Sequence, residues 1–406
     1  MSLYATEVNQ LTSAWLRRTQ GSGVLSGAGL WPLLAVLAAS ADEPGRAELS
    51  AAVGLSADES MDAARDVLKA LADLDGVDAA LGLWAQQAAR VRPEWRDTLP
   101  SGTFGELTGE AGVDQPVLDA WARDRTHGLI ERFPVEAGPA LMLTLATALA
   151  LRTTWQRKFS DEAWTVSGGA WAGRRLAGLQ RTTADADDVR VADSAAGPLT
   201  LTRVAGDNGL DVHLVLGEDS RASGDVLAAA VALLAGDAPV TDGAALLESG
   251  DVERWPGVST VSASRPGLVL KTARFTVRSL HDLLEQADVF GLRAVSSGDR
   301  DHFPAIGPVP LRVDQARQAA VAIFSATGFE AAAVTAIGLR AVSMPVHRAQ
   351  ALAVSYDRPF GFLAVHRESG LVLFAGWVDA PEDWSAAPKA ERPAAMRDRL
   401  PRPSAE

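Results

Sequence analysis

The histidines are the side chains best suited to acid–base or metal chemistry in this chain, but their spacing supports neither role. Metal sites need His, Asp or Glu ligands at short recurring spacings such as HExxH, and no such motif occurs. His281 is followed by Asp282, yet a catalytic triad also needs a nucleophile, so we interpret the two as neighbours on a helix surface. The six histidines are His127, His213, His281, His302, His347 and His366.

Nucleophile and phosphate-binding motifs are also missing. The GSG at 21–23 lacks the flanking residues of GxSxG, and we interpret it as a turn that ends a helix. Neither GxxxxGKS nor GxxxxGKT occurs, and the adjacent carboxylates Asp187 and Asp188 are typical of a solvated loop. The absence of cysteine excludes thiolate catalysis, disulfides and iron–sulfur ligation. We therefore predict no catalytic residue, no metal and no cofactor.

The composition indicates a globular protein with a substantial core. The 406 residues are 47% hydrophobic and 22% charged, and the formal net charge is −13. Such a charge repels phosphate backbones and anionic membrane surfaces, and no local basic patch offsets it. We therefore expect neither a nucleic acid nor a membrane as a partner.

An apolar run near the start has two interpretations. Arg17 and Arg18 precede GLWPLLAVLAASA, which resembles an export signal that ends in small residues. The run is too short to span a bilayer, and the segment before it carries Val8, Leu11 and Trp15 at helical spacing. We favour a buried helix and hence a cytoplasmic protein, with an extracellular location as the alternative.

The first half of the chain has mainly helical patterns. Ser56 and Glu59 form a capping-box pattern before MDAARDVLKALADL. Asp114 is expected to cap the helix VLDAWARDRTHGLIERF, and Pro134 to help end it. The apolar run ALMLTLATALAL fits either a buried helix or a strand covered on both faces.

The second half has mainly alternating patterns typical of strands. These are LTLTRVA, LDVHLVLG, LVLKTARFTVRS, and a C-terminal hairpin of GFLAVHR and LVLFAGWV around Glu368–Gly370. SLHDLLEQADVFGL is predicted to be one more helix, ended near Gly291. Helices followed by strands predict an α+β fold in a single domain of residues 1–385, and residues 386–406 have the composition of a disordered tail.

One segment fits no single element. Residues 326–337 read ATGFEAAAVTAI, where an alanine-rich run follows Gly328 and ends in β-branched residues. Alanine favours a helix, whereas Val334, Thr335 and Ile337 favour a strand. The segment is therefore a candidate for more than one conformation.

Four stretches together resemble the serpin family, over nearly the whole chain to about Pro381. They are the DRPF of Asp357–Phe360, the hairpin strand LVLFAGWVDAP, the stretch DHFPAIGPVPLRVDQARQAAVAIFSATGFEAAAVTAI, and TLATALALRTTWQRKF. The resemblance implies a serpin-like fold of three β-sheets and about nine helices, with an exposed reactive-centre loop at about 328–355. It also implies a monomeric inhibitor, not an enzyme, that traps a target serine or cysteine protease when its cleaved loop inserts into the main sheet.

The resemblance also assigns roles to particular residues. The reactive bond falls between Val342 and Ser343, with Arg340 as the alternative specificity residue. The hinge comprises Gly328, Phe329, Glu330, Ala331, Ala332, Ala333, Val334 and Thr335. The shutter and breach of the main sheet comprise Ser26, Thr147, Trp155 and Gln318. Small hinge side chains suit a segment that must enter a packed sheet, because alternate residues will face its core.

The hinge departs from the family pattern at Phe329, where a small or β-branched residue is usual. Insertion of this ring into a full core predicts an overpacking cost of roughly 1–3 kcal/mol, so Phe329→Thr is expected to favour inhibitor complex over cleaved product. The alternative to an inhibitor is a non-inhibitory serpin-fold protein with a binding or chaperone-like role, in which Phe329 prevents insertion. The third hypothesis is an enzyme with another α+β fold, but the sequence contains no recognisable group of catalytic residues.

Overall fold

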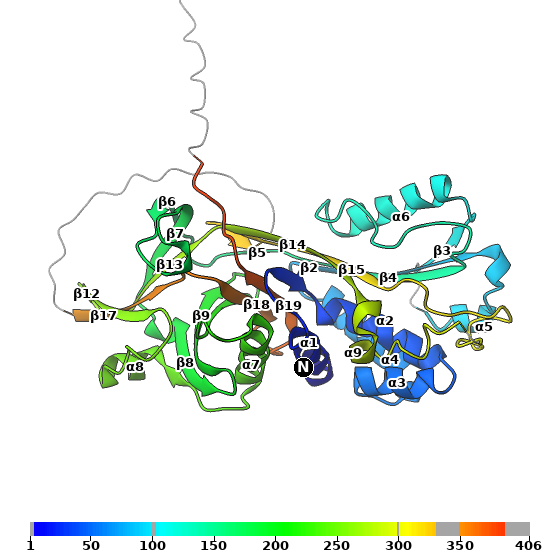
Figure 1. Cartoon of the computed structure of the whole chain (residues 1–406), viewed down its shortest axis with the longest axis horizontal. Coiled ribbons are helices and arrows are strands. Elements are labelled where there is room, and N and C mark those ends of the chain that lie inside the picture. The colour runs from blue at the N-terminus through cyan, green and yellow to red at the C-terminus, as the bar shows by residue number, and fades with distance from the viewer. Residues whose placement is uncertain (1–3, 100–102, 299, 330–348, 386–406) are drawn as a thin grey trace, which may run out of the picture.

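The computed structural model describes residues 4–99, 103–298, 300–329 and 349–385. Within these ranges the chain forms nine α-helices around extended β-sheets (Figure 1). The helices are α1 (Ala5–Leu16), α2 (Gly27–Ser40), α3 (Gly45–Val53), α4 (Ala57–Ala72), α5 (Pro93–Arg96), α6 (Ala111–Arg125), α7 (Ser223–Ala235), α8 (Gly243–Ser249) and α9 (Ala287–Phe290). In these same ranges no helix combines the length and apolar character needed to cross a bilayer.

The strands belong to three layers. One sheet has the order β1-β19-β18-β10-β9-β8-β11 and a second has the order β12-β17-β13-β7-β6. The main sheet is split into β3-β2-β4 and β14-β15-β16-β5.

The strands of the main sheet are β2 (Val77–Gln86), β3 (Phe104–Leu107), β4 (Leu143–Leu151), β5 (Thr153–Thr154), β14 (Phe275–Asp282), β15 (Arg317–Phe324) and β16 (Gly328–Phe329). Those of the seven-stranded sheet are β1 (Gly23–Leu25), β8 (Val189–Ser194), β9 (Gly197–Ala205), β10 (Leu210–Leu216), β11 (Thr241–Asp242), β18 (Phe360–His366) and β19 (Val372–Val378). Those of the five-stranded sheet are β6 (Ser160–Thr165), β7 (Arg175–Thr183), β12 (Val258–Ala263), β13 (Leu268–Ala273) and β17 (Ala349–Ser355).

The main sheet runs along the long axis, with α6 on its outer face and α2 beneath its inner face (Figure 1). Helix α2 is the apolar run that resembles an export signal, and nearly all of its residues are buried. Its N-cap is Ser26, whose Oγ accepts a hydrogen bond from the Gly29 amide at 2.9 Å. The prediction of a buried helix is confirmed, and this helix packs beneath the inner face of the main sheet.

Several predicted elements are present as strands. The ambiguous run ALMLTLATALAL is β4, paired with β2 over nine residues on one edge only. The C-terminal hairpin is β18 and β19, as predicted. LVLKTARFTVRS is divided at Arg274 into β13 and β14, which lie in different sheets.

The predicted ends of the helix around α6 are wrong. The helix begins after Glu110, so Asp114 lies inside it and not at its N-cap. The Asp114 carboxylate instead accepts hydrogen bonds from the amides of Thr108 and Gly109, 2.9 and 2.8 Å away, which fixes the turn before the helix. The helix ends at Arg125, well before Pro134.

The helix predicted over 279–292 begins as a strand, because residues 279–282 belong to β14. Ladder pairing with β15 extends β14 as far as Asp282, and only a 3-10 turn and the short α9 follow before Gly291. His281 is therefore on a strand, where its Nε2 lies 2.8 Å from the carbonyl oxygen of Val24. Burial lowers the pKa of His281, against the effect of that hydrogen bond. The interpretation of a helix-surface pair is wrong because cross-strand pairing overrides the helical pattern.

The prediction of a solvated loop at 187–188 is also wrong for one of the two residues. Asp188 is buried and its Oδ1 accepts from the Arg203 guanidinium at 3.0 Å. Burial raises the pKa of Asp188, while Arg203 opposes the shift. Two adjacent carboxylates do not reveal from sequence alone that one of them is buried with an arginine as its partner.

Tyr356 joins the five-stranded sheet to the seven-stranded sheet. It follows β17 directly, and its fully buried hydroxyl lies 2.9 Å from Thr202 Oγ1 and 3.0 Å from the carbonyl oxygen of Leu214. Burial raises the pKa of Tyr356, so the hydroxyl stays protonated and can donate.

Removal of this hydroxyl should weaken the junction between the two sheets. Tyr356→Phe is expected to lower the free energy of unfolding by roughly 1–3 kcal/mol, because a buried acceptor loses its donor. Urea unfolding followed by circular dichroism measures the change. Tyr4→Phe is the matched control, because the Tyr4 ring stacks on Trp31 and should keep that contact. Equal effects of the two variants would contradict this role for Tyr356.

Candidate functional site

The candidate site is the top of the split in the main sheet, where a two-residue strand enters it. Residue pairs join β16 to β15 on one side (Phe324 with Phe329) and to β5 on the other (Phe329 with Thr153). Both pairings are antiparallel, so β16 is the beginning of a strand between β15 and β5. A Cβ atom on Gly328 would lie 2.3 Å from the Thr153 carbonyl oxygen, so only glycine allows this approach.

A tight turn directs the chain from β15 into β16. The Ser325 amide donates to the Gly328 carbonyl at 3.0 Å, and the Ser325 hydroxyl donates to the same oxygen at 3.0 Å. The turn is anchored by Trp155, whose indole N–H donates to the Ser325 carbonyl at 2.9 Å and whose amide donates to that of Thr327 at 3.0 Å. Trp155 is buried and packs on Phe324, with ring centroids 4.9 Å apart. It thus lies at the top of the main sheet.

Phe329 is already inside the core of the intact chain. Its side chain is 3% exposed, and its ring centroid lies 5.9 Å from that of Phe362 on β18. The overpacking cost was predicted for a ring that enters the core on insertion, whereas this ring is buried in the intact chain.

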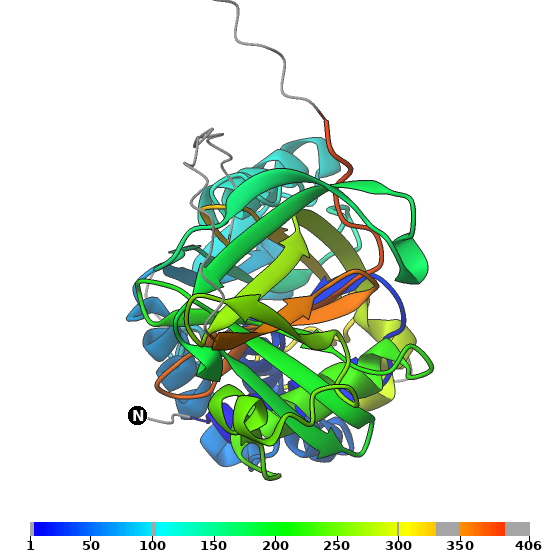
Figure 2. The ribbon, with the colours of Figure 1, turned by 90° about the vertical axis from the view of Figure 1, so that its left-hand side faces the viewer.

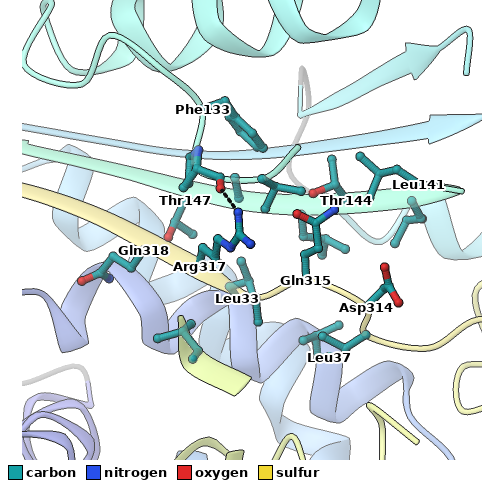
Figure 3. Close-up of a pocket in the computed structure, with 18 of the residues that line it drawn as sticks. Leu33, Leu37, Phe133, Leu141, Thr144, Thr147, Asp314, Gln315, Arg317 and Gln318 are labelled. Carbon is teal, nitrogen blue, oxygen red and sulfur yellow. Dashed lines mark hydrogen bonds between the residues drawn. The ribbon is translucent and has the colours of Figure 1, made fainter. Parts of the chain in front are cut away.

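Below Phe329 the two halves of the main sheet separate. Between β4 and β15, a void of about 10 Å³ lies directly under Phe329, and farther down the gap widens into a cavity of about 290 Å³ (Figure 3). The floor of this cavity is apolar and comes from α2, where Leu33 and Leu37 point upward. Thr144 of β4 and Gln315 before β15 lie on its two sides. In the part of the chain that the structure describes, no ladder joins β4 to β15.

The chain that follows α6 covers the outer side of the gap. The Gln315 amide group exchanges two hydrogen bonds of 3.1 Å with the main chain of Glu136. Arg317 donates to the carbonyl oxygen of Pro134 at 3.4 Å (Figure 3). From the other direction, Gln115 of α6 accepts a hydrogen bond from the Ala137 amide at 2.8 Å. Side chains of α6 and of β15 therefore share this covering segment.

The predicted shutter residues do lie together. Gln318 of β15 exchanges two hydrogen bonds of 2.9 Å with the main chain of Ser26, and Ser26 Oγ donates to the Leu373 carbonyl at 2.6 Å. Thr147 of β4 donates from its hydroxyl to the carbonyl oxygen of Gly29. Thr147 and Gln318 thus anchor the two separated strands to the same end of α2.

Residues that the sequence reasoning missed also shape the site. Gln315 and Ser325 carry no distinctive motif, so their partners could be found only in three dimensions. Arg181 is 4% exposed, lies 4.9 Å above the Phe159 ring, and donates to main-chain carbonyls beside the top of the sheet. Burial lowers the pKa of Arg181 to about 10, which still leaves it charged at neutral pH.

The other predicted site residues lie outside the described residues. These are Glu330, Ala331, Ala332, Ala333, Val334, Thr335, Arg340, Val342 and Ser343. Their roles in the hinge and the reactive bond stay predictions. The predicted tail of residues 386–406 also lies outside the described ranges. Among the described residues, no cluster of three or more His, Asp or Glu side chains can hold a metal ion.

Solved structures share this fold over almost the whole chain. Human thyroxine-binding globulin with thyroxine matches with a TM-score of 0.69 and 14% identity, over 94% of this chain and 98% of that one. Mouse protein Z-dependent protease inhibitor matches with 0.67 and 14%, over 94% and 96%. Cleaved Serpin 42Da matches with 0.70 and 16%, over 94% and 99%. The fold is therefore the serpin fold.

The sequence itself supports membership of the family. The model of the serpin family (serine protease inhibitor) matches residues 237–381, which include β15, β16 and the C-terminal hairpin. The match covers the C-terminal part of the chain, and the likeness to serpin structures extends over almost all of it. A comparison with curated proteins found no match.

The position of Phe329 generates a prediction about the intact chain. Phe329→Thr is expected to lower its free energy of unfolding by roughly 2–4 kcal/mol, because a buried ring is removed from the core. Phe329→Leu should cost less than about 1.5 kcal/mol, since it stays apolar. Urea unfolding of uncleaved protein measures both. No loss for the threonine variant would show that the ring is not buried before cleavage.

Proposed function

We propose that this protein is a serpin-type inhibitor that traps a serine or cysteine protease by insertion of its cleaved loop into the split main sheet. The observation that carries the proposal is β16, which starts a strand between β15 and β5 where the neighbouring strand edges continue unpaired. The chain supplies the site for a new strand, and the attacking nucleophile belongs to the target. The proposal therefore requires no catalytic residue in this protein.

The observed register defines how the new strand would pair. If the strand continued beyond Phe329 in the same register, Ala333 would lie between Leu149 of β4 and Ala320 of β15. Two residues farther, Thr335 would lie between Thr147 and Gln318. The inserted strand would thus reach the shutter with a hydroxyl side chain, which can join the hydrogen bonds at the end of α2.

Side-chain size along the hinge fits this register. Because side chains alternate between faces, an inserted strand would have Ala331, Ala333 and Thr335 on the same inner face as the buried Phe329. The inner neighbours on β15 are themselves small, Ala320 and Ala322, which are both buried. Small residues can therefore enter without displacing the core above α2.

Main-chain hydrogen bonds of the new strand would supply the driving force for its insertion. Each new ladder hydrogen bond contributes roughly 0.5–1.5 kcal/mol, so about ten of them contribute on the order of 10 kcal/mol. The edges of β4 and β15 that would pair with the new strand face the cavity of about 290 Å³. Their pairing after cleavage would make the cleaved protein more stable than the intact one.

The target is proposed from the loop sequence alone. Val342–Ser343 as the reactive bond would suit a protease with a small apolar specificity pocket, such as an elastase-like or subtilisin-like enzyme. Arg340 in that position would suit a trypsin-like enzyme. The target protease is the proposed partner, and the inhibitor is proposed to act as a cytoplasmic monomer.

A second candidate function is the binding of a small molecule by a non-inhibitory member of the fold. Its support is the apolar cavity over α2 and the likeness to thyroxine-binding globulin, a structure solved with thyroxine. Burial of Phe329 before cleavage removes the reason to regard this residue as a barrier to insertion. We therefore place the inhibitory function first.

The proposed function predicts two results after exposure to subtilisin, elastase or trypsin. At least one protease should form a complex that survives SDS, because insertion deforms the acylated enzyme before hydrolysis. The cleaved protein should also have a higher Tm than the intact protein, and intact mass will identify the cleaved bond. Clean cleavage without a complex and without a gain in Tm would reject the inhibitor assignment.

A matched pair of variants tests the role of the hinge in this result. Ala333→Arg places a charge on the inner face and should convert the inhibitor into a substrate, with little complex and a smaller gain in Tm. Glu330→Arg changes a residue of the opposite face that is already charged and should leave complex formation intact. Similar behaviour of the two variants would contradict the proposed register.

A further inference from the structure

The turn that joins β9 to β10, residues 206–209, reaches from the seven-stranded sheet to the top of the main sheet. Figures 1 and 2 show β8 and β9 (green) below the five-stranded sheet, at the end of the molecule opposite α5. An antiparallel bridge pairs Gly206 of the turn with Trp155. The Asp207 amide donates to the carbonyl oxygen of Thr154 at 3.0 Å. The turn therefore covers the edge of β5 that faces away from β16.

Asn208 joins this turn to two other chain segments through a single amide group. Its Nδ2 donates to the carbonyl oxygens of Asp75 and Arg152, each at 2.9 Å. Its Oδ1 accepts a hydrogen bond from Thr153 Oγ1 at 2.6 Å. Carbonyl oxygens can only accept, so they fix which end of the amide carries the hydrogen atoms. The side chain thus connects the turn to the residue before Gly76 and to the junction of β4 with β5.

Two glycines allow these segments to lie so close together. A Cβ atom on Gly206 would lie 2.0 Å from Thr153 Oγ1. Gly76 has a φ of +78°, and a Cβ atom there would lie 2.2 Å from both the Arg152 carbonyl oxygen and Asn208 Nδ2. The backbone itself is therefore shaped for the contact on both sides of Asn208.

A buried ion pair fixes the turn to its own sheet. Asp211 is 2% exposed, and its Oδ2 accepts from Arg367 Nε at 2.8 Å. Arg367 also donates from Nη2 to the Gly206 carbonyl oxygen and from its amide to that of Gly209, each at 2.9 Å. The hydrogen bond to Asp211 raises the pKa of Arg367, so the guanidinium stays charged. Asn208 therefore projects from a firmly held support.

Asn208 lies behind the strand edge that an inserted strand would use. Because hydrogen-bonding groups alternate along a strand, the main chain of Thr153 faces β16, whereas that of Arg152 and Thr154 faces the opposite edge. On that opposite edge the ladder between β4 and β2 ends at Leu151. The bond from Asn208 to Arg152 begins one residue farther on. Asn208 thus replaces β2 as the neighbour at the upper end of β4.

The same contact extends to the fixed end of the hinge. Thr153 is directly opposite Phe329, so their side chains share one face of the sheet, and both are buried. If the strand continued in this register, the next residue of β4 and β5 to lie beside it would be Arg152, whose carbonyl oxygen Asn208 holds. The first new residue pairs would therefore form against a segment that Asn208 keeps in place.

We propose that Asn208 is a positioning residue for loop insertion, which holds the upper end of β4 where the new strand must first pair. This inference rests on the proposed function, since it concerns the speed of the insertion that traps the protease. Without the three hydrogen bonds, the junction of β4 with β5 can move away from the entering strand. Slower insertion gives the acylated protease time for hydrolysis, so more inhibitor ends as cleaved product.

Asn208→Asp tests the two donor hydrogen bonds with almost no change in shape. It keeps an acceptor for Thr153 but places a carboxylate oxygen against two carbonyl oxygens. With a protease that forms a complex with wild type, we expect several-fold more inhibitor molecules consumed per protease inactivated, at an unchanged rate of loop cleavage. Asp207→Asn is the control, because its side chain is exposed and its main-chain bond is kept. Equal consumption by these two variants would overturn the proposal.

Thr153 provides a second test that introduces no charge. Thr153→Val removes the hydroxyl that donates to Asn208 and should shift the ratio of complex to cleaved product in the same direction. Thr153→Ser keeps the hydroxyl and should stay near the wild-type ratio. Because the two residues share a bond, the effects of Thr153→Val and Asn208→Asp should be less than additive in the double variant. Fully additive effects would contradict the proposed coupling.

Tyr356→Phe separates positioning from a general loss of stability. It removes a buried hydrogen bond away from the main sheet, and urea unfolding gives its free energy of unfolding beside that of Asn208→Asp. Tyr356→Phe should leave the ratio of complex to cleaved product unchanged. An equal shift in both variants at equal loss of stability would overturn the positioning role.

The outcome for wild type distinguishes this inference from the function on which it rests. If wild type forms no complex and its cleaved form melts no higher than the intact form, the proposed function fails and the role of Asn208 fails with it. If wild type forms a complex and Asn208→Asp forms it equally well, the role of Asn208 alone is rejected.

Discussion

The separation of β4 from β15 is the constraint on which the rest of the structure depends. Strand edges that face each other without pairing are unfavourable in a folded protein, because buried main-chain donors and acceptors need partners. Here the separation is maintained by side chains that bond to other elements. Gln315 and Arg317 bind the segment over the gap, while Gln318 and Thr147 bind α2 below it. The gap is therefore a built feature of the fold.

Helix α2 sets the position of both strands. Gln318 binds Ser26 and Thr147 binds Gly29, so both strands are attached to the first turn of one helix. Ser26 also donates to Leu373 of β19, which connects the same point to the seven-stranded sheet. A strand that enters between β4 and β15 thus reaches the place where two sheets and a helix meet. The hydrogen bonds of Gln318, Thr147 and Ser26 would connect such a strand to the helix and to both sheets.

Local patterns in the sequence correctly predicted the elements whose secondary structure is decided by neighbouring residues. The C-terminal hairpin was predicted from alternating residues around a turn, and the buried helix α2 from an apolar run too short to span a bilayer. The predictions failed where long-range pairing decides the outcome. Residues 279–282 have a helical pattern but follow the β15 ladder, and Asp114 caps the preceding turn instead of its own helix. The shutter side chains were found by family resemblance, whereas Gln315 and Ser325 have partners that no local pattern reveals.

Phe329 shows why a large residue at the start of an inserting segment need not obstruct it. Overpacking is a cost for a side chain that must enter a core that is already full. Phe329 is buried before any cleavage, against Phe362 of the seven-stranded sheet, so its ring would not have to enter the core during the proposed insertion. The residues that would move later, Ala331 and Ala333, are the small ones. In the proposed insertion, the buried ring would hold the new strand in register, and the small side chains after it would keep the path open.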